Sequence, residues 1–208
     1  MLYKNAVEST TLEILEELCR QEALAAFGLG GGTNIALRKG HRSSFDLGFF
    51  TDKPFNTSIV YKTITSCFKN TELLFEQNQT MMFMINEVKA DFILYPFEWS
   101  LPFEISEDIK LINLEDIIPM KLQAISNRFS KKDFWDIDQL LHDYPLEDML
   151  SIFKTKFPPI DTGYIIHSLT AFEGAESEAD PVCIIPRTWN EVKNNLEQAV
   201  RDYTEKFL

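Results

Sequence analysis

The chain has 208 residues, of which 45% are hydrophobic, so it carries enough apolar side chains for a full core. Its formal net charge is −12, with 20 Lys and Arg against 32 Asp and Glu, which excludes a general electrostatic attraction to nucleic-acid phosphates. Three widely spaced cysteines exclude a disulfide framework and a zinc ribbon, and they indicate a reducing cytoplasm. No apolar run reaches the roughly 20 residues of a membrane helix, so we expect no membrane partner.

The first half of the chain mixes helical and strand patterns. Leucines at helical spacing predict a first helix, capped by Ser9 or Thr10 and ending near Gln21. A short apolar run over 24–29 then leads into Gly30-Gly31-Gly32. The remaining patterns predict, in chain order, a helical turn over 33–38, a strand over 45–50, a helix over 56–68, and strands over 72–77, 81–85 and 88–95. Together these elements predict a mixed sheet flanked by helices.

From about Asn113 onward the spacing of apolar residues becomes helical. It predicts helices over 114–128, 131–142, 146–154, 161–172 and 188–207, with an acidic loop over 173–181 before the last one. We therefore predict an α/β (α+β) chain of two domains, a sheet domain over 1–112 and a C-terminal helical bundle over 113–208.

The glycine run is the first candidate for chemistry. Gly31, Gly32 and Thr33 lie where a strand meets a helix, and backbone N–H groups at such a turn can cradle a phosphate. The run lacks the last glycine of a dinucleotide fingerprint and the Gly-Lys-Ser/Thr of a P-loop. A tight turn that needs a positive φ is the alternative. A basic cluster follows at Arg38, Lys39, His41 and Arg42, with a solvated loop as its alternative.

Two acids interrupt apolar strands, Asp46 in the run 45–50 and Asp91 in the run 88–95. A buried carboxylate is costly unless it binds a metal or a partner. Two such acids on neighbouring strands could hold Mg²⁺, which prefers carboxylate oxygens. The alternative places one or both acids at strand edges in water.

A third candidate lies on the predicted helices of the second half. Lys121 and Arg128 are seven residues apart on one helix face and could grip phosphates. We expect replacement of a phosphate-gripping Lys121 to leave stability nearly unchanged. Asp133 and Asp136 follow, but Ser130 to Asp133 also resembles a capping box, and Asp136 could be a solvated surface acid.

Taken in order, these stretches resemble the AbiEii toxin family, within the polymerase-β-like nucleotidyltransferases. The resemblance covers about residues 24–142. It rests on Gly31-Gly32-Thr33 with Ala36-Leu37-Arg38, on Gly40-His41-Arg42-Ser43-Ser44-Phe45-Asp46-Leu47-Gly48-Phe49-Phe50, on Lys89-Ala90-Asp91-Phe92, and on the run from Lys121 to Asp136.

The resemblance implies a nucleotidyltransferase-like fold and a site for an NTP with two Mg²⁺ ions. It implies that Asp46 and Asp91 bind metal, that Asp91 orients or deprotonates the attacking hydroxyl, and that Lys121 offsets developing charge, which makes these three the candidate catalytic residues. The candidate nucleotide-binding residues are Gly31, Gly32, Thr33, Arg42, Ser44, Lys121, Arg128, Asp133 and Asp136. The implied acceptor is an RNA, a protein or a small molecule, and an antitoxin is an implied partner.

The sequence departs from the family at Gly48, because the family has Asp-x-Asp where this chain has Asp46-Leu47-Gly48. Residues 46 and 48 face the same side of a strand, so Gly48 is expected to leave a gap where a carboxylate would bridge two ions. Fewer ions would then bind. Three hypotheses stay open: an active nucleotidyltransferase, a catalytically impaired relative that binds nucleotide or a partner, and a plain α/β interaction domain.

Overall fold

A computed structural model describes residues 1–207 of the chain. Its residues divide into two compact units, Met1–Asn113 and Leu114–Leu208. No helix of the described part is both long enough and apolar enough to cross a membrane.

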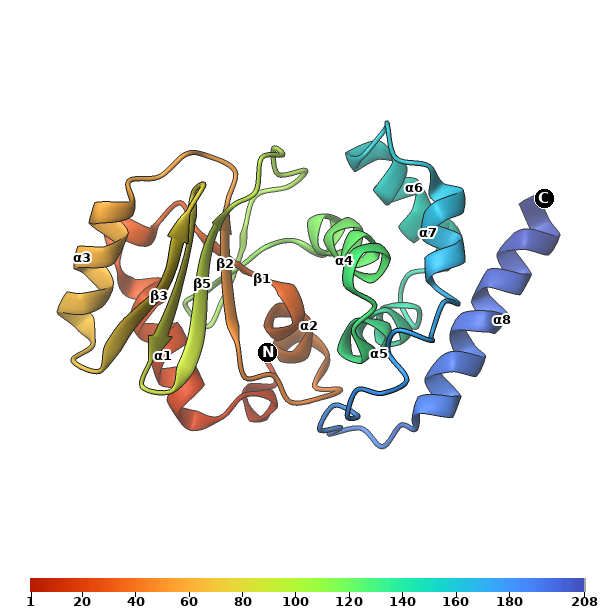
Figure 1. Cartoon of the computed structure of the whole chain (residues 1–208), viewed down its shortest axis with the longest axis horizontal. Coiled ribbons are helices and arrows are strands. Elements are labelled where there is room, and N and C mark those ends of the chain that lie inside the picture. Colours follow the sequence, from red (N-terminus) through yellow and green to blue (C-terminus); the bar gives the residue numbers. More distant parts are fainter. Residues whose placement is uncertain (208) are drawn as a thin grey trace. The chain divides into compact units, whose positions relative to one another are not determined.

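The first unit contains a seven-stranded mixed sheet with the strand order β3-β4-β5-β2-β1-β7-β6 (Figure 1). Strand β2 pairs antiparallel with β1 and parallel with β5, and β1 pairs parallel with β7. The strands are β1 (Gly28–Gly30), β2 (Leu47–Thr51), β3 (Thr71–Gln77), β4 (Thr80–Ile85), β5 (Val88–Leu94), β6 (Glu104–Ser106) and β7 (Ile109–Leu111). The helical elements are η1 (Lys4–Ala6), α1 (Ser9–Arg20), η2 (Glu22–Leu24), α2 (Gly31–Lys39) and α3 (Thr57–Cys67).

Three tight hairpins join β3 to β4, β4 to β5 and β6 to β7. Each has a two-residue loop in which both residues have positive φ: Asn78-Gln79, Asn86-Glu87 and Glu107-Asp108. This loop twists in the same sense as the flanking strands, so it fixes the pairing register. Strands β6 and β7, which the third hairpin joins, were not predicted from the sequence.

Helices α1 and α3 lie on the same side of the sheet (Figure 1). Alternate residues of β2, β4 and β5 are buried, which is the pattern of strands with one face in a core. The core joins the two helices to the strands through Ile14, Leu15, Leu18, Leu47, Phe49, Val60, Ile64, Phe83, Ala90 and Phe92. The residues at the other positions of these strands are more exposed, and this second face carries the candidate site.

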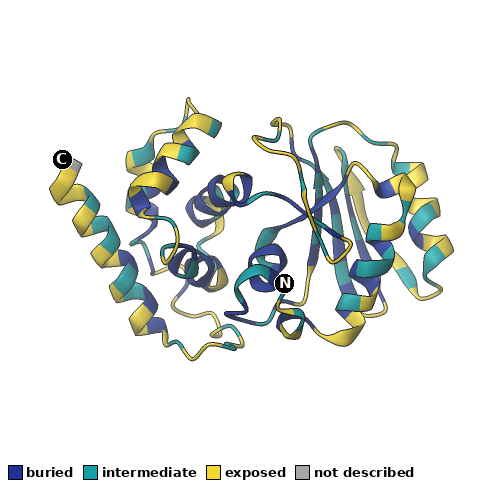
Figure 2. Ribbon diagram, turned by 180° about the vertical axis from the view of Figure 1, so that it is seen from behind, coloured by how far each residue is buried: buried dark blue, intermediate teal, exposed yellow. Residues whose placement is uncertain are grey.

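The second unit consists of five helices, α4 (Leu114–Arg128), α5 (Lys131–Leu140), α6 (Leu146–Lys156), α7 (Thr162–Ser168) and α8 (Trp189–Phe207). Helix α4 contacts α5, α6 and α7, while α8 contacts α5 and α6. Among the side chains of α8 that the structure describes, Trp189, Val192 and Leu196 are buried and most of the others are exposed (Figure 2). Trp189 stacks on Trp135 of α5 with ring centroids 5.3 Å apart.

Candidate active site

The candidate site of the first unit is organised by one row of residues across the sheet. Gly30 of β1 lies opposite Gly48 of β2, and Gly48 lies opposite Asp91 of β5. Residues in register project from the same face, and neighbouring strands are about 4.8 Å apart. The glycine turn and the Asp91 carboxylate therefore lie at the same face of the sheet, with strand β2 between them.

Helix α2 begins at the end of this row. Gly31 has a φ of +63°, as expected for a turn that requires glycine, and no heavy atom lies within 4 Å of the position that its β-carbon would take. No side chain caps the first turn of α2. Backbone N–H groups in a first helical turn have no partner within the helix. The segment is therefore a tight turn that needs a positive φ, as one interpretation of the sequence expected. Its N–H groups at the start of a helix also suit the phosphate cradle of the other interpretation.

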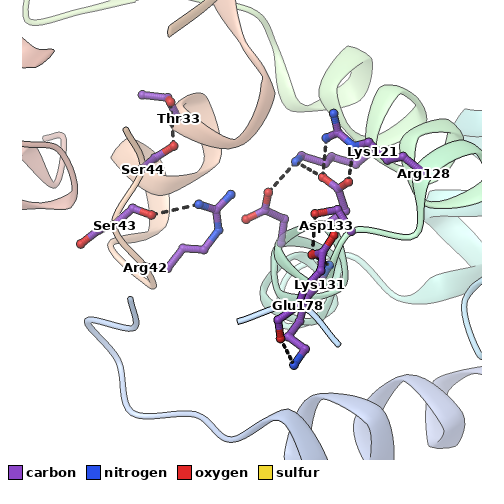
Figure 3. Close-up of polar contacts among 11 residues, drawn as sticks. Thr33, Arg42, Ser43, Ser44, Lys121, Arg128, Lys131, Asp133 and Glu178 are labelled. Atoms are coloured by element: carbon purple, nitrogen blue, oxygen red, sulfur yellow. Dashed lines mark hydrogen bonds and ion pairs between the residues drawn. The ribbon is translucent and has the colours of Figure 1, made fainter. Parts of the chain in front are cut away.

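Thr33 fixes the chain segment that precedes β2 (Figure 3). Its hydroxyl donates a hydrogen bond to the backbone carbonyl of Asp46, and the hydroxyls of Thr33 and Ser44 lie 2.8 Å apart. Because Thr33 has one proton and gives it to a carbonyl, Ser44 is the donor in the second bond. The two hydroxyls thus hold Asp46 in place at the start of the strand.

Removal of this hydroxyl is expected to destabilise the first unit. Thr33→Val keeps the shape of the side chain but leaves the Ser44 hydroxyl and the Asp46 carbonyl without their bonds, which costs about 1–3 kcal/mol. Urea denaturation of Thr33→Val and of the control Thr33→Ser, which keeps the hydroxyl, measures the difference. Equal stability of Thr33→Val and the parent would contradict this role.

Asp46 itself lies one residue before β2 and is exposed, so its placement inside an apolar strand was wrong. The apolar alternation of the strand begins only at Leu47. Asp91 does lie inside its strand, and its side chain is 17% exposed. The Nζ of Lys89 lies 2.7 Å from the Oδ2 of Asp91, whereas the Oδ1 of Asp91 is buried and has no hydrogen-bond partner. Within residues 1–207, no group of three or more His, Cys, Asp or Glu side chains is arranged to hold a metal ion.

The expected gap at Gly48 is bordered by an aromatic ring. A β-carbon on Gly48 would lie 3.1 Å from Cε2 of Phe50, and one on Gly30 would lie 2.7 Å from Cδ2 of the same ring. Phe50 is two residues from Gly48 and so projects from the same face. The Phe50 ring therefore borders the gap at Gly48 and would have to shift by a few tenths of an ångström to admit a side chain there.

The basic cluster is not a solvated loop. Arg38 donates to Asn34, to the Ile112 carbonyl and to Glu104, the last at 2.7 Å. His41 and Arg42 are both buried. The guanidinium of Arg42 donates to the Ser43 carbonyl (Figure 3).

The candidate residues of the second unit form an ion cluster around two buried carboxylates (Figure 3). The Nζ of Lys121 lies 2.7 Å from Asp133 and 2.5 Å from Asp136, and both carboxylates are fully buried. Arg128 donates to both oxygens of Asp133, at 2.6 Å and 2.8 Å. Burial raises the pKa of Asp133, but the charges of Lys121 and Arg128 outweigh burial and hold that pKa below its usual range.

This cluster overturns two interpretations from the sequence. Asp133 binds two cations instead of completing a capping box, and the Ser130 side chain makes no capping bond to α5. Asp136 is completely buried, so it is not a surface acid. Lys121 lies on α4 and the two acids lie on α5, so these ion pairs form because the two helices pack together. The spacing of residues within one helix could not predict them.

Comparison with known proteins agrees with this architecture. Residues 13–207 match the model of the nucleotidyl transferase AbiEii toxin family, type IV toxin–antitoxin system. The chain is 32% identical over 199 residues to an uncharacterized protein of Aquifex aeolicus strain VF5, covering 93% of this chain and 95% of that protein.

Two solved structures share the fold. A candidate nucleotidyltransferase from H. pylori has a TM-score of 0.59 at 15% identity, with 96% of each chain covered. MenT4, a nucleotidyltransferase toxin from Mycobacterium tuberculosis, has a TM-score of 0.58 at 13% identity, covering 95% of this chain and 86% of that one. The predicted fold class, a mixed sheet with flanking helices followed by C-terminal helices, is confirmed. The chain therefore belongs to the AbiEii family of nucleotidyltransferase toxins of type IV toxin–antitoxin systems.

Proposed function

We propose that this protein transfers a nucleoside monophosphate from an NTP to an RNA, protein or small-molecule acceptor, and that it acts as a toxin with an antitoxin partner. The observation that carries the proposal is the row Gly30, Gly48 and Asp91, which aligns the glycine turn with a carboxylate that has one unsatisfied, buried oxygen. An unsatisfied buried acceptor is costly, and a hard cation would satisfy it.

The glycine turn would bind the phosphates of the NTP. Gly31 and Gly32 open the first turn of α2, where backbone N–H groups and the helix dipole favour an anion. The hydroxyls of Thr33 and Ser44 are engaged with each other, so in this proposal Thr33 contributes its backbone amide to the phosphates. Arg42 would add a positive charge near the same segment.

Asp46 and Asp91 would hold the Mg²⁺ ions. When bound, such ions activate the attacking hydroxyl and stabilise the pyrophosphate leaving group. Asp91 would orient the hydroxyl of the acceptor and accept its proton, and its fixed position inside β5 suits that role. Asp46 is held at its backbone by Thr33, and the residue is exposed.

Lys121 would neutralise charge on the nucleotide phosphates. An ammonium group has three protons, and two acids, Asp133 and Asp136, each approach the Nζ of Lys121. One proton is left for a phosphate oxygen. In this proposal Asp133 and Asp136 position the cations, with Arg128 held by the bidentate contact to Asp133.

A second function, nucleotide binding without transfer, is favoured by one observation. Gly48 replaces the second acid of the family motif, and the Phe50 ring borders the position of its missing side chain. A site with one carboxylate fewer has fewer ligands for two metal ions, although the glycine turn for the phosphates is intact.

Isothermal titration with ATP, CTP, GTP and UTP, each with and without Mg²⁺, tests both functions. We expect at least one NTP to bind, and Mg²⁺ to tighten its binding, because a cation would satisfy Asp91. The variant Asp91→Asn is expected to lose the Mg²⁺ effect and to keep metal-free binding. Incorporation from labelled NTPs into total RNA and protein then separates transfer from binding alone. Failure of all four NTPs to bind would contradict both functions.

A further inference from the structure

Lys89 and Asp91 form an ion pair on the face of the sheet that carries the candidate site. They are two residues apart on β5, so their side chains project from the same face. The Nζ of Lys89 lies 2.7 Å from the Oδ2 of Asp91, and the two side chains are 37% and 17% exposed. A hydrogen bond between two charged groups is stronger than one between neutral groups, so this pair fixes the orientation of the carboxylate.

The two oxygens of Asp91 thus have different surroundings. Oδ2 is held by an ammonium group, and Oδ1 is buried without a partner. On the neighbouring strand, the residue in register with Asp91 is Gly48, which contributes no oxygen from a side chain. The nearest ring atom to a β-carbon there belongs to Phe50, which cannot ligate a hard cation.

We propose that the Lys89 ammonium occupies one of the two cation positions at Asp91, so that this site binds a single divalent cation, through Oδ1. The inference rests on the proposed function, because it concerns the metal content of that same site. It makes Lys89 a positioning residue, since it acts on the reaction through the Asp91 carboxylate.

The charges are consistent with this exchange. Three carboxylates with two divalent cations have the same net formal charge as two carboxylates with one divalent cation and one ammonium group. The chain lacks a carboxylate at position 48 and has an ammonium group on Asp91.

A second divalent ion would be unfavourable at Oδ2 of Asp91 while Lys89 is in place. Ions in a two-metal site are about 3.5–4 Å apart, so an ion at Oδ2 would lie close to the ammonium group and be repelled by it. With Lys89 in place, one of the two cation positions at Asp91 is therefore already occupied by an ammonium group.

The test counts Mn²⁺ ions bound per chain in the presence of a saturating, non-reactive methylene analogue of the NTP that binds in the titration above. Electron paramagnetic resonance of free Mn²⁺ gives the count. We expect one ion for the parent and two for Lys89→Met, because loss of the ammonium releases Oδ2. Lys89→Arg keeps a cation and should bind one. Lys62→Met, which removes an exposed lysine of α3, is the matched control and should also bind one.

Binding of two ions by the parent, or of one ion by a folded Lys89→Met variant, would overturn the inference. Circular dichroism checks the fold of each variant, and the count for the parent decides the question if Lys89→Met does not fold. Analogue binding is measured in the same samples. A parent that binds the analogue with two ions refutes only the role of Lys89, whereas a parent that binds neither analogue nor metal refutes the proposed function as well.

Discussion

Replacement of Lys121 by alanine is expected to destabilise the C-terminal unit by about 3–5 kcal/mol. Lys121 is 3% exposed, and its ammonium group contacts the fully buried carboxylates of Asp133 and Asp136. Its removal leaves the two buried acids without the cation that contacts both of them. Differential scanning calorimetry and urea denaturation measure the loss. This expectation replaces the one drawn from the sequence, in which Lys121 only gripped phosphates and its loss left stability nearly unchanged.

The matched control is Arg201→Ala, which removes an exposed cation from α8 and is expected to change stability by less than about 0.5 kcal/mol. In the double variant Lys121→Ala/Asp136→Asn, one of the two buried carboxylates that lose the ammonium group is itself made neutral. Part of the lost stability should therefore return, as non-additivity between residues in contact. A Lys121→Ala variant as stable as the control would show that the buried cluster does not depend on this cation.

Restoration of the missing acid is expected to raise nucleotidyl transfer by roughly 10²-fold, provided that space is made for it. In Gly48→Asp/Phe50→Ala, the new carboxylate would project beside Asp91, with which residue 48 is in register. Gly48→Asp alone should gain less, because its β-carbon would lie 3.1 Å from the Phe50 ring. Label incorporation from NTPs into total RNA and protein measures the activity, and the Mg²⁺ dependence of the melting temperature reports metal binding.

Two controls separate charge from space. Gly48→Asn/Phe50→Ala has nearly the same shape without the charge, and Phe50→Ala alone removes the ring, so neither should gain activity. If the parent is already active and the double variant is no better, the site works without an acid at position 48 and the non-catalytic alternative is refuted. If no variant is active or stabilised by Mg²⁺, the metal-binding roles of Asp46 and Asp91 are refuted.

The local elements follow from short stretches of sequence because their causes are local. The helix predicted over 114–128 has the bounds of α4, since its apolar spacing and its acidic first turn act within the helix itself. Strands β4 and β5 alternate buried and less buried residues, and the predicted strands 81–85 and 88–95 lie within a residue of them. The hairpin of β6 and β7 was missed because its strands have three residues each and its turn, Glu107-Asp108, lacks the usual Asn or Gly.

The chemistry of the candidate residues depended on longer-range contacts. Sequence spacing identified Lys121, Asp133 and Asp136, but their ion pairs exist because α4 packs on α5. Thr33 was identified with the glycine turn, although its hydroxyl contacts Asp46, 13 residues away. The ion pair of Lys89 and Asp91 could have been predicted from the sequence. The two residues are two positions apart on a strand, and residues at that spacing project from the same face.

The sequence by itself determined the family, the mixed sheet followed by helices, and the glycine turn, because ordered motifs and hydrophobic periodicity are properties of neighbouring residues. Only the tertiary structure decided that Gly48 lies in register between Gly30 and Asp91, and that the Phe50 ring borders the missing side chain. It also decided which buried charges are paired. Strand register and helix packing bring together residues far apart in the chain, and the energy of a buried charge depends on the partners that such packing supplies.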